Sequence, residues 1–385
     1  MIGMAAIAPM ADLAVAPGTT WLYTGAEGPP LATQAAAFGR YLANRALGPA
    51  GRAEHTLVEQ RLRERLARML GLRPEDIGLV SNSSEATNMV ANSLRLEPGD
   101  NVVLNDLEYP SVVQPWLRLA SLGIEIRLAR HADWSMPSTL ITSLIDKRTK
   151  LVALSHVSYH SGWRHDLAAI SDSAGQAGAQ VMLDATQSFG VINIPTELID
   201  VTIASSYKWL LGGHGLGIIG WNQRRRPLPV PAGVGWRSVP QIFTDDRFQR
   251  YQLRDDARRF ELGFPSYPSI YQLDDSLAWL CQFDTLHVEK HVLALGGQLI
   301  EALAERGKKL LTPSEPHRRA GNIAFSAQHG EALAAALAER RIYCWGGDGR
   351  VRVSIHLFNS EDDIACLLDA LSDLPGRLQL PDPRR

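Results

Sequence analysis

Cysteine is scarce in this chain, and its spacing excludes two common kinds of scaffold. The 385 residues contain only Cys281, Cys344 and Cys366, with no CxxC pair. Such wide spacing fits neither a disulfide framework nor a structural zinc site, so we expect no metal centre. A reducing cytoplasm is then the simplest setting for the protein.

Long apolar runs and an excess of one charge are also lacking. No stretch reaches the roughly 18 uninterrupted apolar residues of a membrane helix. The apolar N-terminus has its first basic residue at Arg40, so we do not interpret it as a secretion signal. A formal net charge of -2 gives no reason to expect nucleic acid or an anionic membrane as partner.

Strand-like and helical stretches alternate along most of the chain. Short β-branched runs are followed by helical spacing, which predicts an α/β fold with a mostly parallel, doubly wound sheet. The expected strands are residues 77–80, 102–104, 124–128, 151–154, 181–183 and 201–204, and the expected helices include 56–70, 112–122 and 167–177. Residues 223–258 have little periodicity, and we expect a long excursion at a subunit interface.

The length favours more than one domain. We expect an N-terminal segment at 1–30, a large domain at 31–264 and a smaller α+β domain at 265–385. In the last of these, the pattern predicts one long helix from 271 through 292. Further elements are expected at 322–326, 331–340 and 351–355.

Polar side chains follow two of the expected buried strands at the points where the strands end. Asp184 and Gln187 follow the first strand, and Ser205 through Lys208 follow the second. Ligands of open α/β sheets bind beyond the carboxyl ends of the strands, so a carboxylate and a lysine there indicate a site. Trp209 and its apolar neighbours would make the ammonium of Lys208 costly, as a Schiff-base lysine requires.

A hydroxyl-rich turn lies between an expected strand and an expected helix. The stretch Ser81-Asn82-Ser83-Ser84-Glu85 would direct free backbone N–H groups and the helix dipole at one spot, which favours an anion site. An N-terminal helix cap without a ligand is the alternative. Together these turns supply what pyridoxal 5′-phosphate needs: phosphate donors, an anionic partner for the ring nitrogen and a lysine.

These motifs resemble the class V aminotransferase family of fold-type I enzymes that use pyridoxal 5′-phosphate. SNSSEATNMVAN resembles the family's phosphate turn, DATQ its DxAQ motif, SSYKWLLGGHG its lysine turn and RVSIHLFN its C-terminal arginine run. The resemblance implies a Schiff base at Lys208, with Asp184 at the pyridine nitrogen and Gln187 at the phenolic oxygen. It places the phosphate at Ser83, Ser84, Ser205 and Tyr207. Arg352 would bind the substrate carboxylate in a bidentate way.

Departures from the family pattern indicate the branch. EYPS stands where cysteine desulfurases have a ring-stacking histidine and resembles a turn of kynureninases, so Tyr109 would stack on the cofactor, unless it is a core tyrosine. Cys344 is too close to Arg352 for the desulfurase loop, which argues against cysteine desulfuration. The motifs come closest to kynureninase and isopenicillin-N-epimerase-like members. This resemblance implies that Trp236 would reach the cofactor phosphate of the partner subunit.

Three further residues are candidate substrate contacts. Phe264 stands where the family often donates a threonine across the dimer, and it would shape an apolar pocket instead. Tyr159 and His160 are expected near the cofactor, where His160 would act as acid or base or give hydrogen-bonded support. His156 is expected to be structural, and His214 is as consistent with a loop as with a ligand.

We therefore expect a cytoplasmic homodimer with shared active sites that acts on an α-amino acid or a cysteine conjugate. Lyase-type chemistry, by β-elimination or C–S or C–C cleavage, is favoured. The alternatives are a class V aminotransferase and a decarboxylation-coupled deaminase, with a role in antibiotic biosynthesis or other secondary metabolism. A vestigial, non-enzymatic protein of the same fold is disfavoured because Asp184, Lys208 and Arg352 are all present.

Overall fold

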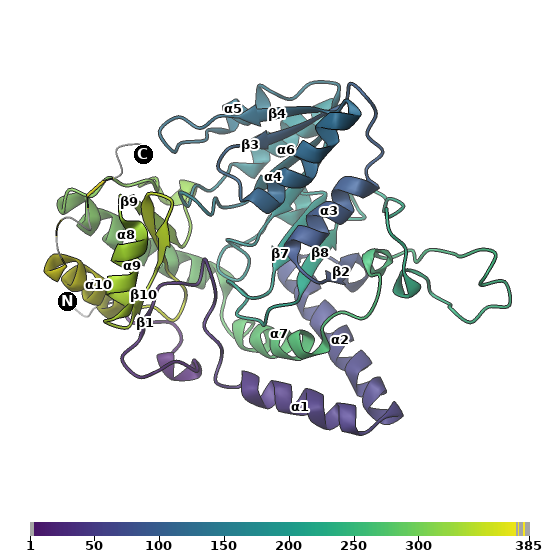
Figure 1. The fold of residues 1–385 in the computed structure, drawn as a ribbon, viewed down its shortest axis with the longest axis horizontal. Coiled ribbons are helices and arrows are strands. Elements are labelled where there is room, and N and C mark those ends of the chain that lie inside the picture. Colours follow the sequence, from purple (N-terminus) through teal and green to yellow (C-terminus); the bar gives the residue numbers. More distant parts are fainter. Residues whose placement is uncertain (1–3, 375, 377–379, 382–385) are drawn as a thin grey trace.

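A seven-stranded sheet forms the centre of the protein (Figure 1). The structure is a computed structural model that describes residues 4–374, 376, 380 and 381. The strand order is β2-β8-β7-β6-β5-β3-β4, and only β8 runs antiparallel to its neighbours. The strands are β2 (Ile77–Val80), β3 (Asn101–Asn105), β4 (Glu125–Ala129), β5 (Thr149–Ser155), β6 (Gln180–Asp184), β7 (Val201–Ser205) and β8 (Gly217–Trp221). The predicted mostly parallel α/β sheet is confirmed.

Helices cover both faces of this sheet because its strands are apolar on both sides. Leu151 faces one cluster of buried side chains and Val152 faces the other, as alternation along a strand requires. The helices of the large sheet are α1 (Gln34–Ala46), α2 (Pro49–Leu70), α3 (Ser83–Ser93), α4 (Pro110–Leu117), α5 (Ser138–Thr142), α6 (Leu167–Ala177) and α7 (Tyr267–Leu280). Side chains of α3 and α4 pack on one face, and those of α2, α6 and α7 pack on the other.

Helix α2 begins earlier than its apolar spacing predicts. Gly48, with a φ of 59°, and Pro49 in the first turn start the helix. A Cβ on Gly51 would lie 1.5 Å from the carbonyl oxygen of Asn44, so glycine lets α1 and α2 meet at a close corner. The end is as predicted, with Gly71 in the left-handed conformation after Leu70.

The C-terminal part packs helices against a three-stranded antiparallel sheet of order β11-β12-β9. Its elements are α8 (Thr285–Glu305), β9 (Asn322–Ser326), α9 (Gly330–Ala338), β10 (Ile342–Tyr343), β11 (Trp345–Gly347), β12 (Arg350–Ser354) and α10 (Glu361–Asp373). The prediction of one long helix over 271–292 is wrong. The chain breaks between α7 and α8, where the Asp284 side chain caps α8 by accepting a hydrogen bond from His287 N.

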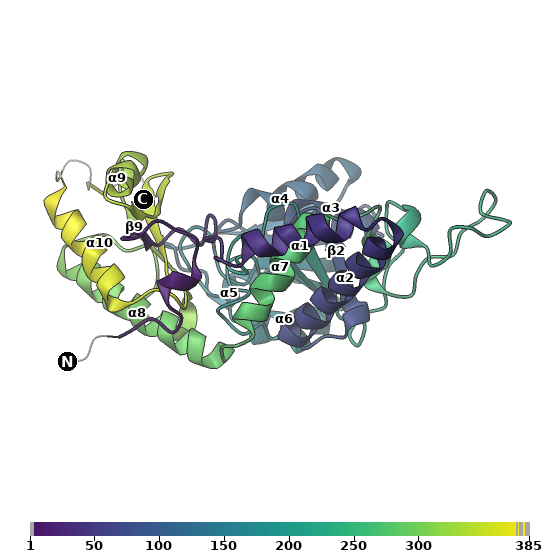
Figure 2. The ribbon, with the colours of Figure 1, turned by 90° about the horizontal axis from the view of Figure 1, so that it is seen from below.

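The first part of the N-terminal segment lies against the C-terminal part of the chain (Figures 1 and 2), and its end reaches the large sheet, where Gly28 N donates to the carbonyl of Tyr207. Strand β1 (Thr20–Trp21) pairs in parallel with β10. The backbone N–H groups of Ile7 and Ala8 donate to the carbonyl of Leu357. The first three residues of the apolar N-terminal stretch lie outside the described residues. The division into segments at 30 and 264 stays a prediction, and α7 packs at that junction against α1 and α2.

The predicted excursion projects from the body of the protein as a long arm (Figures 1 and 2). Residues 223–256 contain no strand or α-helix. Three aromatic side chains of the arm are largely exposed: Phe243 at 85%, Phe248 at 87% and Tyr251 at 62%.

No described helix is both long and apolar enough to cross a membrane.

Candidate active site

The carboxyl ends of three neighbouring strands place the candidate residues together. Strand β6 lies between β5 and β7, and the register pairs Ser155 with Asp184. Asp184 ends β6, and Lys208 lies three residues after the end of β7. Parallel strands present their carboxyl ends at one edge, so the carboxylate and the amine lie in the same region, where each charge influences the other. This is the edge at which the sequence predicts a site.

Lys208 is partly buried among aromatic rings. Its Nζ lies 5.4 Å from the centre of the Tyr109 ring and 5.7 Å from that of Tyr207. Burial, with the nearby Arg352 guanidinium, lowers the pKa of Lys208 to about 8, and Asp184 opposes this. The lowered pKa increases the neutral fraction of the amine near neutral pH, and the neutral amine is the nucleophile.

Asp184 is buried and held by the turn that follows it. Its Oδ1 accepts a hydrogen bond of 2.8 Å from the N–H of Thr186, whose hydroxyl in turn accepts one from Ser205 N. Burial raises the pKa of Asp184, while the Thr186 hydrogen bonds and the charge of Lys208 oppose the rise. A cationic ring nitrogen beside Asp184 would favour the ionised carboxylate further.

The hydroxyl-rich turn begins α3, as the sequence predicts. The Asn82 side chain caps the helix by accepting from Glu85 N at 2.8 Å. The N–H groups of Ser83 and Ser84 have no helical partner by geometry. Ser205 Oγ lies 2.8 Å from Ser83 Oγ, so hydroxyls from two strand ends converge at this helix N-terminus. The arrangement suits a phosphate.

Gln187 is more fully engaged than its predicted contact with the phenolic oxygen suggests. Its Oε1 accepts hydrogen bonds from Trp209 Nε1 at 3.0 Å and from Asn322 Nδ2 at 2.9 Å. Its Nε2 donates to the carbonyl of Gly25 at 2.9 Å. One N–H of the amide is left to meet a cofactor oxygen. The cofactor contact of Gln187 stays a prediction.

Arg352 is buried on β12 and faces the same space as Lys208. Its Nη1 donates to the backbone carbonyl of Tyr159 at 2.6 Å, and its guanidinium lies 5.4 Å from the Trp345 ring. Its buried Nε has no hydrogen-bond partner among the described residues. Burial and the neighbouring Arg350 lower the pKa of Arg352 to about 9. A buried guanidinium with an unused donor suits a carboxylate ligand.

Glycine is required beside this guanidinium. A Cβ on Gly25 would lie 2.5 Å from Asn322 Oδ1 and 3.2 Å from Arg352 Nε. The loop that carries Gly25 thus forms a wall of the site. Sequence reasoning missed Asn322 and Trp345, which reach the site only through the pairing of β9, β11 and β12.

Tyr109 and Tyr159 form an aromatic wall. Their rings meet edge to face, with centres 5.0 Å apart. Tyr109 is 46% exposed, so it is not a core tyrosine. The ring of Tyr207 stacks on that of His214, with centres 4.1 Å apart. His214 therefore lies against a residue that is predicted to bind the phosphate.

His160 contacts a second arginine rather than Lys208. Its Nε2 lies 2.7 Å from Arg350 Nη1 and 3.2 Å from Asp348 Oδ2, and its ring stacks on Trp134. The sequence offered one signal for Arg350: it stands two residues before Arg352 on a strand, so both lie on one face. The structure therefore favours a supporting role for His160 through its contacts with Arg350 and Asp348. An acid–base role of His160 stays a prediction.

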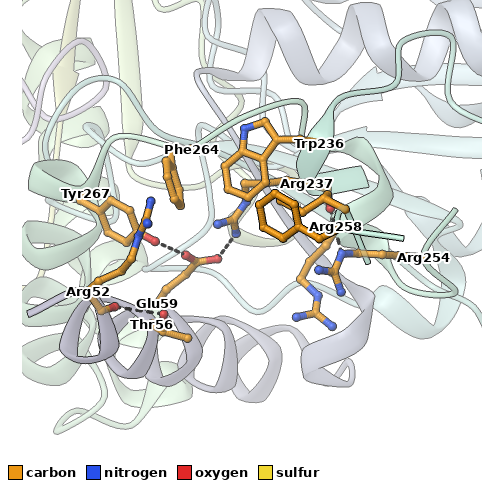
Figure 3. Close-up of a pocket in the computed structure, with 11 residues that line it drawn as sticks. Arg52, Thr56, Glu59, Trp236, Arg237, Arg254, Arg258, Phe264 and Tyr267 are labelled. Carbon is orange, nitrogen blue, oxygen red and sulfur yellow. Dashed lines mark hydrogen bonds and ion pairs between the residues drawn. The ribbon is translucent and has the colours of Figure 1, made fainter. Parts of the chain in front are cut away.

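Trp236 and Phe264 lie together in another hollow of about 640 Å³ (Figure 3). Their rings meet edge to face at 4.6 Å, and Arg52 and Arg237 lie over the Phe264 ring. Figure 3 shows Glu59 at the floor of this hollow, bonded to Tyr267 and Arg237. Within one chain, the rings of Trp236 and Phe264 thus contact each other. The predicted contacts of Trp236 with the cofactor and of Phe264 with the substrate remain predictions.

The residues present fit pyridoxal 5′-phosphate. Hydroxyls and free N–H groups gather at the start of α3, a buried carboxylate lies beside an amine of lowered pKa, and Arg352 has an unused buried donor. These are the partners that a phosphate, a ring nitrogen, an aldehyde and a substrate carboxylate require.

Comparison with known proteins gives a consistent result. A family model described as Aminotransferase class-V matches residues 40–367. Isopenicillin N epimerase of Streptomyces clavuligerus is 28% identical over 353 residues, covering 82% of this chain and 84% of that protein. The apo cysteine desulfurase of Thermococcus onnurineus NA1 has a TM-score of 0.86 at 23% identity, covering 94% and 96%. The cystine C-S lyase C-DES, bound to cysteine persulfide, has a TM-score of 0.83 at 22% identity, covering 93% and 98%.

Fold and site together define a fold-type I enzyme dependent on pyridoxal 5′-phosphate. The chain belongs to the class V aminotransferase family.

Proposed function

We propose that the protein is a lyase that cleaves the Cβ–S bond of a cysteine-type amino acid by β-elimination. The observation that carries the proposal is the placement of Lys208 beside Arg352, with no reactive cysteine at the site. Arg352 would hold the α-carboxylate, and the Lys208 amine would face Cα. The solved relative C-DES is named a cystine C–S lyase, which supports this class of substrate.

The residues divide the work as follows. The Arg352 guanidinium binds and orients the substrate carboxylate by paired N–H donors. The neutral Lys208 amine takes the proton from Cα, and Asp184 holds a negative charge against the ring nitrogen. Pyridoxal 5′-phosphate, when bound, supplies the electron sink for the pair left at Cα. The Cβ–S pair leaves on sulfur, which is protonated, and hydrolysis of the remaining fragment gives pyruvate and ammonia.

The cysteines argue against desulfuration through a protein persulfide. Cys344 is buried between β10 and β11, and burial raises its pKa to about 12, so it holds no thiolate near neutral pH. Cys281 follows the end of α7 and Cys366 lies on α10. None of the three is on the elements that form the site. Sulfur would therefore leave with the product rather than on the enzyme.

A second candidate is kynureninase-type Cβ–Cγ cleavage. Tyr109, in the EYPS turn, and Tyr159 form an aromatic wall beside Lys208, which could receive an aromatic substrate side chain. Transamination and decarboxylation-coupled deamination use the same first contacts with Lys208 and Arg352. A role in antibiotic biosynthesis is supported by the isopenicillin N epimerase relative, and a cytoplasmic setting by the free cysteines.

The reaction is tested with the purified, cofactor-loaded enzyme. Panels of cystine, cysteine conjugates, kynurenine and ordinary amino acids are incubated with it, and pyruvate, ammonia and the pyridoxamine form are followed. Catalytic pyruvate and ammonia from sulfur-containing substrates, without a keto-acid requirement, are expected. Stoichiometric pyridoxamine, or turnover of kynurenine alone, would contradict the proposal.

We also propose that the active unit is a homodimer. The arm exposes Phe243, Phe248 and Tyr251, and the adjacent hollow exposes Trp236 and Phe264. Exposed aromatic side chains gathered in this way mark an interaction surface. A second copy that covers them would bring Trp236 toward the partner's phosphate site, as the family resemblance implies.

The dimer is tested by sedimentation of a double variant, Phe243→Ser with Phe248→Ser. We expect it to dissociate at concentrations where the wild type is dimeric. Leu286→Ser is the matched control, because Leu286 is 60% exposed but lies on α8, away from the arm. A monomeric wild type would contradict the homodimer, and equal dimerisation of the double variant and the control would contradict the role of the arm in it.

A further inference from the structure

Glu108 is a buried carboxyl group that the proposed mechanism does not use. It is 7% exposed and stands directly before Tyr109, at the start of α4. The Ser155 N–H lies 2.8 and 2.9 Å from its two oxygens, and the Ser155 hydroxyl lies 2.5 Å from Oε2. Asn105 Nδ2 approaches Oε1 at 2.5 Å. The carboxyl group thus joins β3, β5 and the turn that carries the aromatic wall.

Its partner Ser155 connects it to Asp184. Ser155 ends β5 and is paired in register with Asp184, which ends β6. The next residue, His156, donates its backbone N–H to the carbonyl of Asp184. Glu108 and Asp184 are therefore two buried carboxyl groups supported by one pair of strand ends.

Ionising both buried carboxyl groups at this edge would cost free energy. Burial is the main cause that disfavours ionisation of Glu108, and the charge of Asp184 adds to it. Four hydrogen-bond approaches from Ser155 and Asn105 oppose this, and the result is a pKa of about 7 for Glu108. His156, beside Ser155, adds no positive charge because burial lowers its pKa well below its ordinary value.

The other charged group at this edge acts on Asp184. The ammonium of Lys208 favours the ionised form of Asp184. A cationic ring nitrogen would favour it more strongly. The negative charge of the pair is thus drawn to Asp184, which leaves Glu108 as the group that binds the proton.

We propose that Glu108 is a positioning residue that acts through Asp184 and Tyr109. It fixes the β5 end and the Tyr109 turn by its hydrogen bonds, and it takes up a proton so that Asp184 alone carries the negative charge. When Glu108 loses this proton, its negative charge acts on the neighbouring Asp184. The change at Asp184 would then alter the charge that faces the cofactor ring. The inference rests on the proposed cofactor site and adds a residue to it.

The test is a pH titration of the visible absorbance of the enzyme loaded with pyridoxal 5′-phosphate. The wild type is expected to show a step near neutral pH, and Glu108→Gln, which stays neutral, is expected to lack it. Asp106→Asn is the matched control. Asp106 lies in the same loop but contacts His131, so its variant should keep the step. An unchanged step in Glu108→Gln would overturn the inference.

Ser155→Ala gives an independent arm if Glu108→Gln does not fold. Loss of the hydroxyl removes a donor that favours the ionised carboxylate, so the step should move to higher pH. A step that does not move would count against Glu108. If the wild type binds no pyridoxal 5′-phosphate, the proposed function itself fails. If it binds and only these shifts are missing, the role of Glu108 alone fails.

Discussion

The first charged pole of the site, Asp184 with Lys208, and the second, Arg352, are built in different ways. Asp184 and Lys208 are 24 positions apart in sequence and follow adjacent strands of one sheet. Arg352 reaches the same space from another sheet and is held by the carbonyl of Tyr159, 193 positions away. The first pole is a local product of a parallel sheet, whereas the second depends on how the C-terminal part packs. The first should therefore govern chemistry, and the second substrate binding.

Removing the amine of the first pole should have the largest effect. In Lys208→Ala, the group that takes the Cα proton is missing, and kcat should fall by at least about 10³-fold. Single-turnover assays with a cysteine conjugate measure this loss. Lys150→Ala is the control, because Lys150 is 47% exposed and paired with Asp100. Turnover of Lys208→Ala near that of the control would remove Lys208 from the chemistry.

Neutralising Asp184 should come next. Asp184→Asn keeps the size of the side chain but removes the charge that faces the ring nitrogen, and kcat should fall by about 10²-fold to 10³-fold. Thermal unfolding should change little, because the amide oxygen can still accept from Thr186 N. Asp172→Asn, on the exposed face of α6, should keep full activity. Near wild-type kcat for Asp184→Asn is the result that would break the distinction between the poles.

The second pole should affect KM more than kcat. Arg352→Gln removes the bidentate donor to the substrate carboxylate, and kcat/KM should fall by roughly 10-fold to 100-fold. Arg352→Lys should recover part of this loss because it restores charge but not the planar fork. Steady-state kinetics separate the two constants. A fall in kcat at unchanged KM would place Arg352 in the chemistry.

The contrast between the poles also explains what the sequence could predict. The central strands, α6 and the placement of Asp184 and Lys208 at one sheet edge follow from short apolar runs and the rule for strand ends. The contacts of Gln187 with Trp209 and Asn322 could not be predicted, because they depend on long-range packing. The contact of Arg350 with His160 was missed for the same reason, although the place of Arg350 two residues before Arg352 was a signal in the sequence.

The break between α7 and α8 was missed for a local reason. Trp279, Phe283 and Leu286 keep a helical spacing across the break, so the apolar pattern alone predicts one helix. The cap at Asp284 ends that pattern by offering the backbone another hydrogen-bond partner. A capping residue inside an apolar pattern was thus the signal that the prediction overlooked.

The smallest expected effect is on stability, and it sharpens the description of the first pole. Burial lowers the pKa of Lys208 from an ordinary 10.5 to about 8, so the folded apoprotein binds fewer protons than the unfolded chain between these values. Its free energy of unfolding should therefore rise as pH increases from about 8 to about 10.5. Lys208→Met should remove this contribution and stabilise the apoprotein at pH 7 by roughly 2 kcal/mol.

Urea unfolding of the apoproteins at several pH values checks this prediction. Lys150→Met, at an exposed position, should retain the wild-type dependence on pH. Equal slopes for the wild type and Lys208→Met over this range would show that the amine is as well hydrated in the folded protein as in the unfolded chain.

Chemical trapping of the cofactor tests the central claim most directly. The wild-type enzyme is loaded with pyridoxal 5′-phosphate, reduced with borohydride and digested, and the labelled peptide is identified by mass spectrometry. We predict a single labelled site at Lys208, between Tyr207 and Trp209. A label on another lysine, or no label on protein that has bound the cofactor, would contradict the account.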